Sequence, residues 1–191
     1  MTDPALIADA ASPDPDTRER ALDALGDDLS PEAQAILTRA LAEDPNDSVR
    51  GTAAWNLKEA GTPAARSALL RAVADDPSEH VRAEALQALQ PYRHPDVLDA
   101  LLAEIERPKR SRIPRQAVSR QLGDYDDARA VHGLGRLLED EDVFVRDWAA
   151  ESLLKLNRPE ARPYWELALE DVSADVRDAA RHALAELGGG D

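Results

Sequence analysis

The chain of 191 residues contains no cysteine, which excludes disulfide scaffolds, thiolate nucleophiles and thiolate metal sites. Aromatic residues are also scarce, with three Trp, three Tyr and one Phe. Valine and isoleucine together number only 14, so the residues that favour β-strands are too few for an extensive sheet. The sequence therefore excludes a disulfide-rich domain and disfavours a β-protein.

Basic residues are outnumbered, because 38 Asp and Glu face 23 Lys and Arg and give a formal net charge of −15. Such a chain repels phosphate groups at long range, so we expect neither nucleic acid nor a membrane surface as its partner. The sequence also lacks an apolar run long enough to span a bilayer. Asp3 and Asp9 lie among the first residues, which lack the basic start and apolar run of a signal peptide, so we expect none there. We expect a cytoplasmic protein.

Alanine and leucine are abundant, with 35 and 25 residues, and both favour helices. They recur with a period of 31 to 33 residues around six arginines, Arg18, Arg50, Arg82, Arg115, Arg146 and Arg177. Seven residues after each arginine the chain has leucine: Leu25, Leu57, Leu89, Leu122, Leu153 and Leu184. An apolar residue three positions after the arginine completes one face of a helix. The period predicts a repeat protein.

A second helix follows in each of the first five units. Apolar residues recur 15, 19 and 23 positions after the arginine, again at helical spacing. Turn-forming residues separate the two helices, namely Gly26, Gly61, Pro91, Gly123 and Asn157. Before the first helix, Asp44-Pro45 and Asp76-Pro77 predict an N-cap aspartate followed by proline at the first helical position.

The pattern predicts an all-α fold, a right-handed α-solenoid of about five and a half two-helix repeats in a single domain. Residues 1–11 form an N-terminal cap, 12–170 five two-helix repeats, 171–187 a C-terminal capping helix and 188–191 a tail. One helix pair cannot bury its own apolar face, so neighbouring repeats must stack to form a continuous core.

The repeat unit resembles a known family. Residues 76–89 follow the pattern D-P-x-x-x-V-R-x-x-A-x-x-x-L, which is similar to the HEAT-like repeat of the phycobilisome-lyase type. The resemblance implies that second helices line the concave face and first helices the convex face. It also implies a ladder between loop aspartates and helix arginines, built from Asp44, Asp76, Asp140 and Asp171 with Arg50, Arg82, Arg146 and Arg177.

Catalytic motifs are missing from the sequence. None of the four histidines is followed by Glu, although related deoxyhypusine hydroxylases bind iron through repeated His-Glu pairs. The chain has no phosphate-binding loop and no G-x-S-x-G elbow. Gly133 and Gly135 lie inside a predicted helix, where small residues favour close helix packing. We therefore predict no catalytic residue, cofactor or metal, and a chain that is not an enzyme.

Exposed positions of the second helices provide candidate binding residues on the concave face. They have a balanced charge that suits protein recognition better than a nucleic-acid groove. The candidates are Arg39, Arg71, Asp99, Arg129, His132, Arg136 and Tyr164.

Residues 107–120 contain six basic side chains and no acidic one, unlike the rest of the chain. Five of them form a candidate docking loop for an acidic or phosphorylated protein segment. These five are Arg107, Lys109, Arg110, Arg112 and Arg115. Pro114 should place the start of the following helix late, because proline is favoured in a first turn.

Trp55 replaces a residue that is polar in the other repeats, so we expect it to be exposed on the convex face and to contact a partner.

The resulting hypothesis is a monomeric scaffold or adaptor that binds another protein. A chromophore-lyase-like subunit related to bilin lyases is the alternative, and it rests on the resemblance alone. A HEAT-like DNA glycosylase is a third reading, which the net charge and the balanced concave face oppose.

Overall fold

The computed structural model describes residues 2–107 and 111–188. All regular structure in these ranges is helical, as predicted. The chain divides into two compact units, residues 1–100 (unit 1) and 101–191 (unit 2). No helix within the described ranges combines the length and the apolar character needed to cross a membrane. Lys109 and Arg110 of the predicted docking loop lie outside the described residues.

The predicted alternation of first and second helices is confirmed. First helices are α2 (Pro15–Leu25), α4 (Asp47–Asn56), α6 (Glu79–Leu89), α8 (Arg112–Leu122), α10 (Val143–Leu156) and α12 (Ala174–Gly188). Second helices are α3 (Pro31–Glu43), α5 (Pro63–Asp75), α7 (Pro95–Ile105), α9 (Ala128–Leu137) and α11 (Arg162–Ala168). A short helix α1 (Pro4–Asp9) precedes them, and 3-10 turns cover Lys58–Ala60, Gln90–Tyr92 and Pro159–Ala161.

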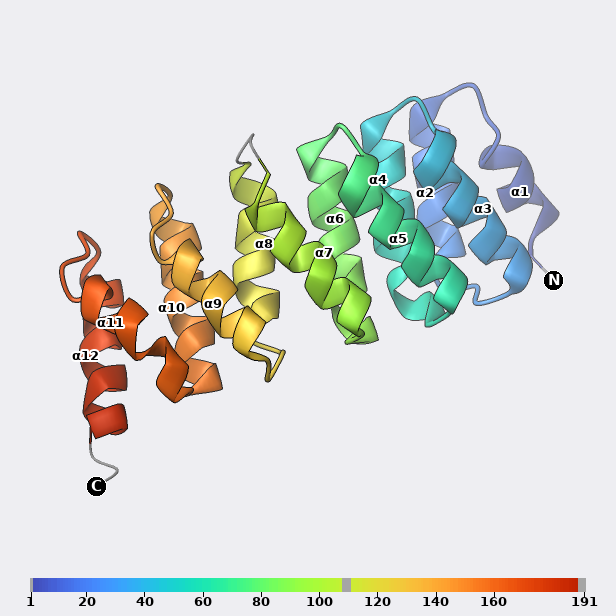
Figure 1. The fold of residues 1–191 in the computed structure, drawn as a ribbon. Helices are drawn as coiled ribbons and strands as arrows, with labels where there is room; N and C mark the ends of the chain where they lie inside the picture. Colours follow the sequence, from blue (N-terminus) through green and yellow to red (C-terminus); the bar gives the residue numbers. More distant parts are fainter. Residues whose placement is uncertain (1, 108–110, 189–191) are drawn as a thin grey trace. The chain divides into compact units, whose positions relative to one another are not determined.

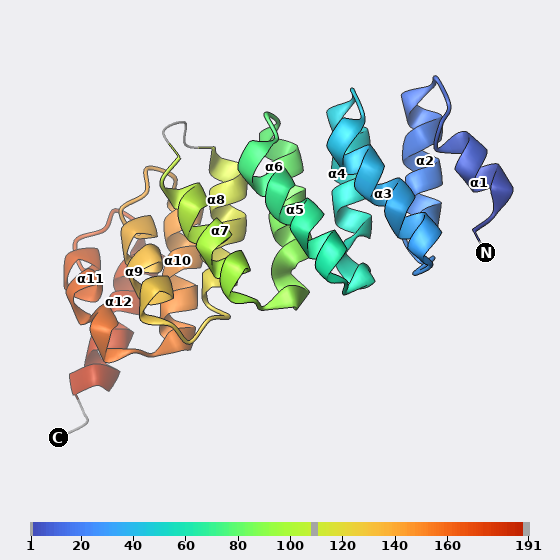
Figure 2. The same ribbon diagram turned by 45° about the vertical axis from the view of Figure 1, so that its right-hand side comes forward.

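Unit 1 consists of two helical layers. First helices α2, α4 and α6 pack side by side in one layer, and α3 packs beside α5 in the other (Figure 1). The turned view in Figure 2 shows α3 and α5 on the same side of that row. The repeated leucines Leu25, Leu57 and Leu89 are completely buried between the layers, so the predicted core positions are confirmed.

Unit 2 repeats this arrangement. α10 packs between α8 and α12, and α9 and α11 cover the row (Figure 1). Leu122 and Leu153 are completely buried, and Trp165 fills the core position that leucine occupies in other repeats, with 1% of its surface exposed. The boundary between the two units falls within α7.

Helix starts are encoded locally. Asp14, Ser30 and Thr62 are N-caps whose side chains accept backbone N–H bonds of the first turn, and each precedes proline at the first helical position. A capping side chain satisfies an N–H group that has no partner inside the helix, and proline there loses no hydrogen bond. Pro114 lies in the first turn of α8, as predicted, but the late start predicted for this helix is wrong. α8 begins at Arg112, three residues before Arg115, just as α4 begins three residues before Arg50.

The predicted N-caps Asp44 and Asp76 are wrong. Asn46 and Ser78 cap α4 and α6, so each aspartate lies two residues before its cap. The Asp44 carboxylate instead accepts the backbone N–H of Asn46 at 2.9 Å, and Asp76 accepts that of Ser78 at the same distance. Each of these carboxylates can therefore also accept hydrogen bonds from an arginine of the preceding repeat, Arg18 for Asp44 and Arg50 for Asp76.

Candidate functional site

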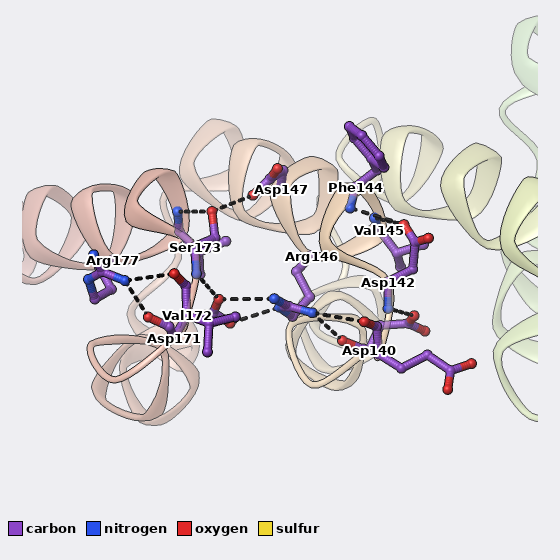
Figure 3. A network of polar contacts seen from close by, with 12 residues as sticks. Asp140, Asp142, Phe144, Val145, Arg146, Asp147, Asp171, Val172, Ser173 and Arg177 are labelled. Carbon is purple, nitrogen blue, oxygen red and sulfur yellow. Dashed lines mark hydrogen bonds and ion pairs between the residues drawn. The ribbon is translucent and has the colours of Figure 1, made fainter.

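Arginines of the first helices bind the loop aspartates of the following repeat. In unit 2 the Arg146 Nε lies 2.8 Å from Asp171 Oδ2, and its Nη2 donates to Oδ1 at 3.2 Å. The Arg146 Nη1 also donates to the backbone carbonyl of Asp140 at 2.7 Å (Figure 3). Each such arginine therefore joins its own loop to the next, and we call these pairs the ladder.

The same arrangement occurs in unit 1. Arg18 binds Asp44 and Arg50 binds Asp76, with Nε–Oδ2 distances of 2.7 and 2.8 Å. Burial raises the pKa of the Asp44 carboxyl, but hydrogen bonds from Arg18 and from the Asn46 backbone outweigh it, and the pKa lies below its ordinary value. The ladder expected from the family resemblance is thus present at Arg50 and Arg146 and extends to Arg18. Arg82 and Arg177, the other two expected members, donate to backbone carbonyls of Asp76 and Asp171 in their own loops.

Arg115 belongs to this ladder and not to a docking loop, so its predicted role in partner binding is wrong. Its Nε lies 2.7 Å from Asp140 Oδ2, and the two side chains are only 4% and 3% exposed. A guanidinium this deeply buried against a carboxylate cannot meet a partner without breaking the pair. The repeat period of the sequence already indicated this structural role, because Arg115 stands at the position that the ladder arginines occupy in the other repeats.

Two other basic side chains of the predicted loop lie at the surface of unit 2. Arg107 pairs with the buried Glu104 within the same turn of chain. Arg112 has a side chain that is 56% exposed, and its Nε is 3.9 Å from an Asp142 oxygen. Arg112 therefore has the more accessible charge of the two.

A groove of about 540 Å³ runs between the C-terminal part of α7 and α9, inside unit 2. Leu102, Ala103 and Ile105 line it from α7, and Gly133 lines it from α9. Three predicted concave-face residues, Arg129, His132 and Arg136, lie along the same groove. The structure thus brings together three of the second-helix candidates around apolar side chains.

The charges of this groove are partly neutralised from within. Arg136 pairs with Glu106 across the groove, and Arg129 Nη2 lies 3.0 Å from Asp127 Oδ2. The Arg129 side chain and the backbone N–H of Arg129 both lower the pKa of Asp127 by hydrogen bonding to its carboxylate. The groove can therefore accept an apolar side chain flanked by polar groups.

Tyr164 of α11 packs against α9 and does not stand free on a concave surface. Its hydroxyl is 2.5 Å from His132 Nδ1, and a Cβ added to Gly135 would lie 2.5 Å from its ring. An added Cβ at Gly133 would lie 2.8 Å from Leu102 and 3.2 Å from Ile105. The two glycines thus permit close helix packing, as predicted.

The remaining second-helix candidates lie in unit 1. Arg39, Arg71 and Asp99 are exposed on α3, α5 and α7. Arg71 lines a separate groove of about 420 Å³ between α3 and α5, together with Thr38 and Ala68. The structure does not gather these three residues around one site.

Trp55 is 45% exposed on α4, and the Lys58 Nζ lies 5.1 Å from its ring centroid.

Sequence reasoning missed a larger exposed apolar group on α8 and α10, formed by Ile113, Val143 and Phe144. The available signal was the register: Ile113 and Phe144 both stand two residues before a ladder arginine, where the repeats of unit 1 have Asp16, Ser48 and His80.

Metal ligands do not gather in the described residues, where no three His, Asp or Glu side chains converge on one point. The chain also lacks the His-Glu pairs that the family resemblance associates with iron. The residues present therefore do not fit a di-iron centre, and no chemistry is derived from one.

A family model for HEAT repeats matches residues 4–90 and 98–185. Among solved structures, the CpcE–CpcF complex of phycocyanin lyase from Nostoc sp. PCC7120 is similar, with TM-score 0.68 and 23% identity over 98% of this chain and 77% of that one. Human deoxyhypusine hydroxylase matches with TM-score 0.52 and 18% identity, over 94% and 82% of the two chains. No curated protein matches.

Computationally designed armadillo repeat proteins for modular peptide recognition match with TM-score 0.64 and 19% identity, over 95% of this chain and 98% of theirs. At these identities the likeness concerns the fold. Since phycocyanin lyase and deoxyhypusine hydroxylase are enzymes that share it, the prediction that the chain is not an enzyme is wrong. An all-helical repeat scaffold does not imply the absence of catalysis.

Proposed function

We propose, on the premise that the chain belongs to the HEAT-repeat family, that it is a protein-binding module whose α7–α9 groove receives a segment of a partner protein. One observation carries the proposal: Leu102, Ala103 and Ile105 form an apolar wall beside Arg129, His132 and Arg136. An apolar pocket bordered by a few polar groups suits a side chain of a protein ligand.

Arg112 provides a second contact in the proposal, as the exposed side chain in the described part of the predicted docking loop, whereas Arg107 is paired with Glu104. An exposed guanidinium binds carboxylate or phosphate through its planar donors. We therefore propose an acidic or phosphorylated segment as the partner's contribution, and a monomeric chain in the absence of that partner. The balanced charge of the groove itself favours protein over nucleic acid.

The test is to fill the groove. Ala103 is exposed on α7, so Ala103→Trp should occupy the groove without disturbing the core. Ala35→Trp, at an exposed alanine of α3, is the matched control. Tagged full-length proteins are used to capture partners from the host, and each captured partner is purified for measurement of its Kd.

The expected result is a partner whose Kd rises at least about tenfold with Ala103→Trp, a loss of about 1.4 kcal/mol, and is unchanged with Ala35→Trp. Circular dichroism checks that both variants remain helical. If every captured partner binds both variants as it binds the unmodified chain, the groove is not the binding site and the proposal fails.

A chromophore-lyase-like subunit is the second candidate, favoured by the similarity to the phycocyanin lyase complex across 98% of this chain. The test is the absorbance difference spectrum of a bilin titrated with the purified protein. A saturable spectral shift supports this candidate, and an unchanged spectrum at equimolar and excess protein removes it.

A further inference from the structure

We infer that the first-helix surface of unit 2 is a second docking surface, distinct from the α7–α9 groove. We define this surface by Ile113 and Arg120 of α8 together with Val143, Phe144 and Trp148 of α10. The proposal is that it binds a short protein segment that combines an apolar side chain with a carboxylate. The two helices pack against each other, and Arg120 of α8 stacks on Trp148 of α10, which brings side chains of the two helices together there.

Arg120 is positioned for such a ligand. Its guanidinium carbon lies 4.7 Å from the ring centroid of Trp148, so one face of the guanidinium is stacked. Within the described residues, no carboxylate or other acceptor bonds to its N–H groups. Stacking restricts the long side chain and leaves its planar donor edge for a carboxylate.

Apolar side chains next to Arg120 are exposed to an unusual extent. Phe144 is 55% exposed, Ile113 41% and Val143 37%. Ile113 and Phe144 occupy the same register position in adjacent repeats, and Phe144 and Trp148 are four residues apart on α10. Residues at this spacing lie on one helix face, so Phe144 and Trp148 share a face of α10, and Ile113 and Arg120, seven residues apart, share a face of α8.

The composition of the surface matches the residues that dominate protein interfaces. Tryptophan and arginine are enriched among residues whose removal weakens binding most, and surrounding contacts of small energetic weight exclude water from them. Scattered exposed apolar residues would need no explanation, but here they gather around one arginine without an acidic partner. The surface is thus suited to protein recognition.

Charge decides which occupant fits. On α8, Arg115 is neutralised by Asp140 and Arg112 lies 3.9 Å from an Asp142 oxygen, so Arg120 is the charge that attracts a carboxylate at this surface. A second copy of the chain would bring its own net charge of −15 against an equal charge. Such repulsion opposes self-association and equally opposes a long polyanion. We therefore assign the surface to a short segment with one or two carboxylates.

The experiment uses the full chain labelled with nitrogen-15 and a synthetic twelve-residue probe peptide of leucine, serine and glutamate. A matched peptide has glutamine in place of each glutamate. We expect saturable shifts of the Trp148 indole N–H and of α8 and α10 backbone amides. The glutamine peptide should bind at least about tenfold more weakly, since it lacks the charged acceptor for Arg120.

Variants test the assignment independently of the groove. Arg120→Glu and Phe144→Ala should each weaken binding of the glutamate peptide at least about tenfold, whereas Arg20→Glu, the matched charge reversal on α2, should not. Ala103→Trp should also leave this binding intact, which separates it from the proposed function.

Several results would overturn the inference. One is the absence of shifts with the glutamate peptide at millimolar concentration, and another is a shift pattern confined to Arg129, His132 and Arg136. Equal binding by Arg120→Glu and the unmodified chain would also do so. Sedimentation that shows Arg120-dependent dimers would reassign the surface to a second copy.

Discussion

Arg115 and Asp140 form an ion pair that is almost completely removed from solvent, with 4% and 3% of their side chains exposed. Asp140 also accepts the backbone N–H of Asp142, which caps α10. One carboxylate thus fixes both the arginine of the preceding repeat and the start of the next first helix. The pair joins neighbouring repeats of unit 2 through directional bonds in addition to apolar packing.

Asp140→Ala should therefore lower the free energy of unfolding by about 3 kcal/mol or more, because it leaves the Arg115 charge buried without a counter-charge. Urea unfolding followed by circular dichroism measures the change. Asp126→Ala is the control, since its pair with Arg158 is exposed and should contribute less than about 1 kcal/mol. Equal losses in the two variants would contradict the role assigned to burial.

Gly135→Ala should destabilise unit 2 although alanine is the better helix former. A Cβ at this position would lie 2.5 Å from three ring atoms of Tyr164, so the ring must move and its contact with His132 is lost. Overpacking of this kind costs about 1–3 kcal/mol, against a helix-propensity gain of about 1 kcal/mol. Gly188→Ala meets nothing within 4 Å and serves as the control in thermal unfolding.

Acid should weaken the ladder. Burial raises the pKa of Asp44, but the hydrogen bonds from Arg18 and from the Asn46 backbone lower it by more, so the pKa lies below its ordinary value. Hydrogen bonding to Arg158 also lowers the pKa of Glu160, to about 2. A carboxyl with a lowered folded pKa contributes stability above its unfolded value of about 4, and that contribution is lost as the pH falls through the folded pKa.

We therefore expect the free energy of unfolding to decline below about pH 4, and to decline less steeply in Asp44→Asn. Urea titrations at pH 7, 5, 4 and 3 measure both. An identical pH dependence in the variant and the unmodified chain would show that Asp44 does not contribute.

Repeat periodicity predicted the core because burial at a given register position is the same in each interior repeat. Leu25, Leu57, Leu89, Leu122 and Leu153 are all completely buried. The N-caps were predicted less well, because Asp-Pro fits both a cap and the extended residues before one. What distinguishes the two roles is the contact between Asp44 and Arg18 of the preceding repeat, which the local sequence around Asp44 does not contain.

The candidate site was predictable in part. Helical spacing placed Arg129, His132 and Arg136 on one face of α9, and all three line the α7–α9 groove. The packing of Tyr164 onto Gly135 and the stacking of Arg120 on Trp148 depend on how neighbouring helices meet, and helical spacing within one repeat does not contain that information. For Arg115 the position in the repeat was the better guide. The local run of basic residues predicted an exposed docking loop, whereas the repeat position predicted a buried ladder arginine.

Arg181→Leu should make the chain self-associate. The ladder arginine is followed four residues later by Leu22, Ala54, Leu86, Ser119 and Ala150, all buried by neighbouring helices. In α12 the same position is Arg181, whose side chain is 58% exposed and pairs with Asp178. This charge makes the position polar in α12, where the other first helices have a buried small or apolar residue. Leucine at position 181, beside the partly exposed Leu184, would create an exposed apolar face on α12.

Sedimentation velocity over a hundredfold concentration range should show a rising average mass for Arg181→Leu only, with Arg162→Leu on α11 as the matched control. A concentration-independent mass for both variants would show that Arg181 does not prevent self-association.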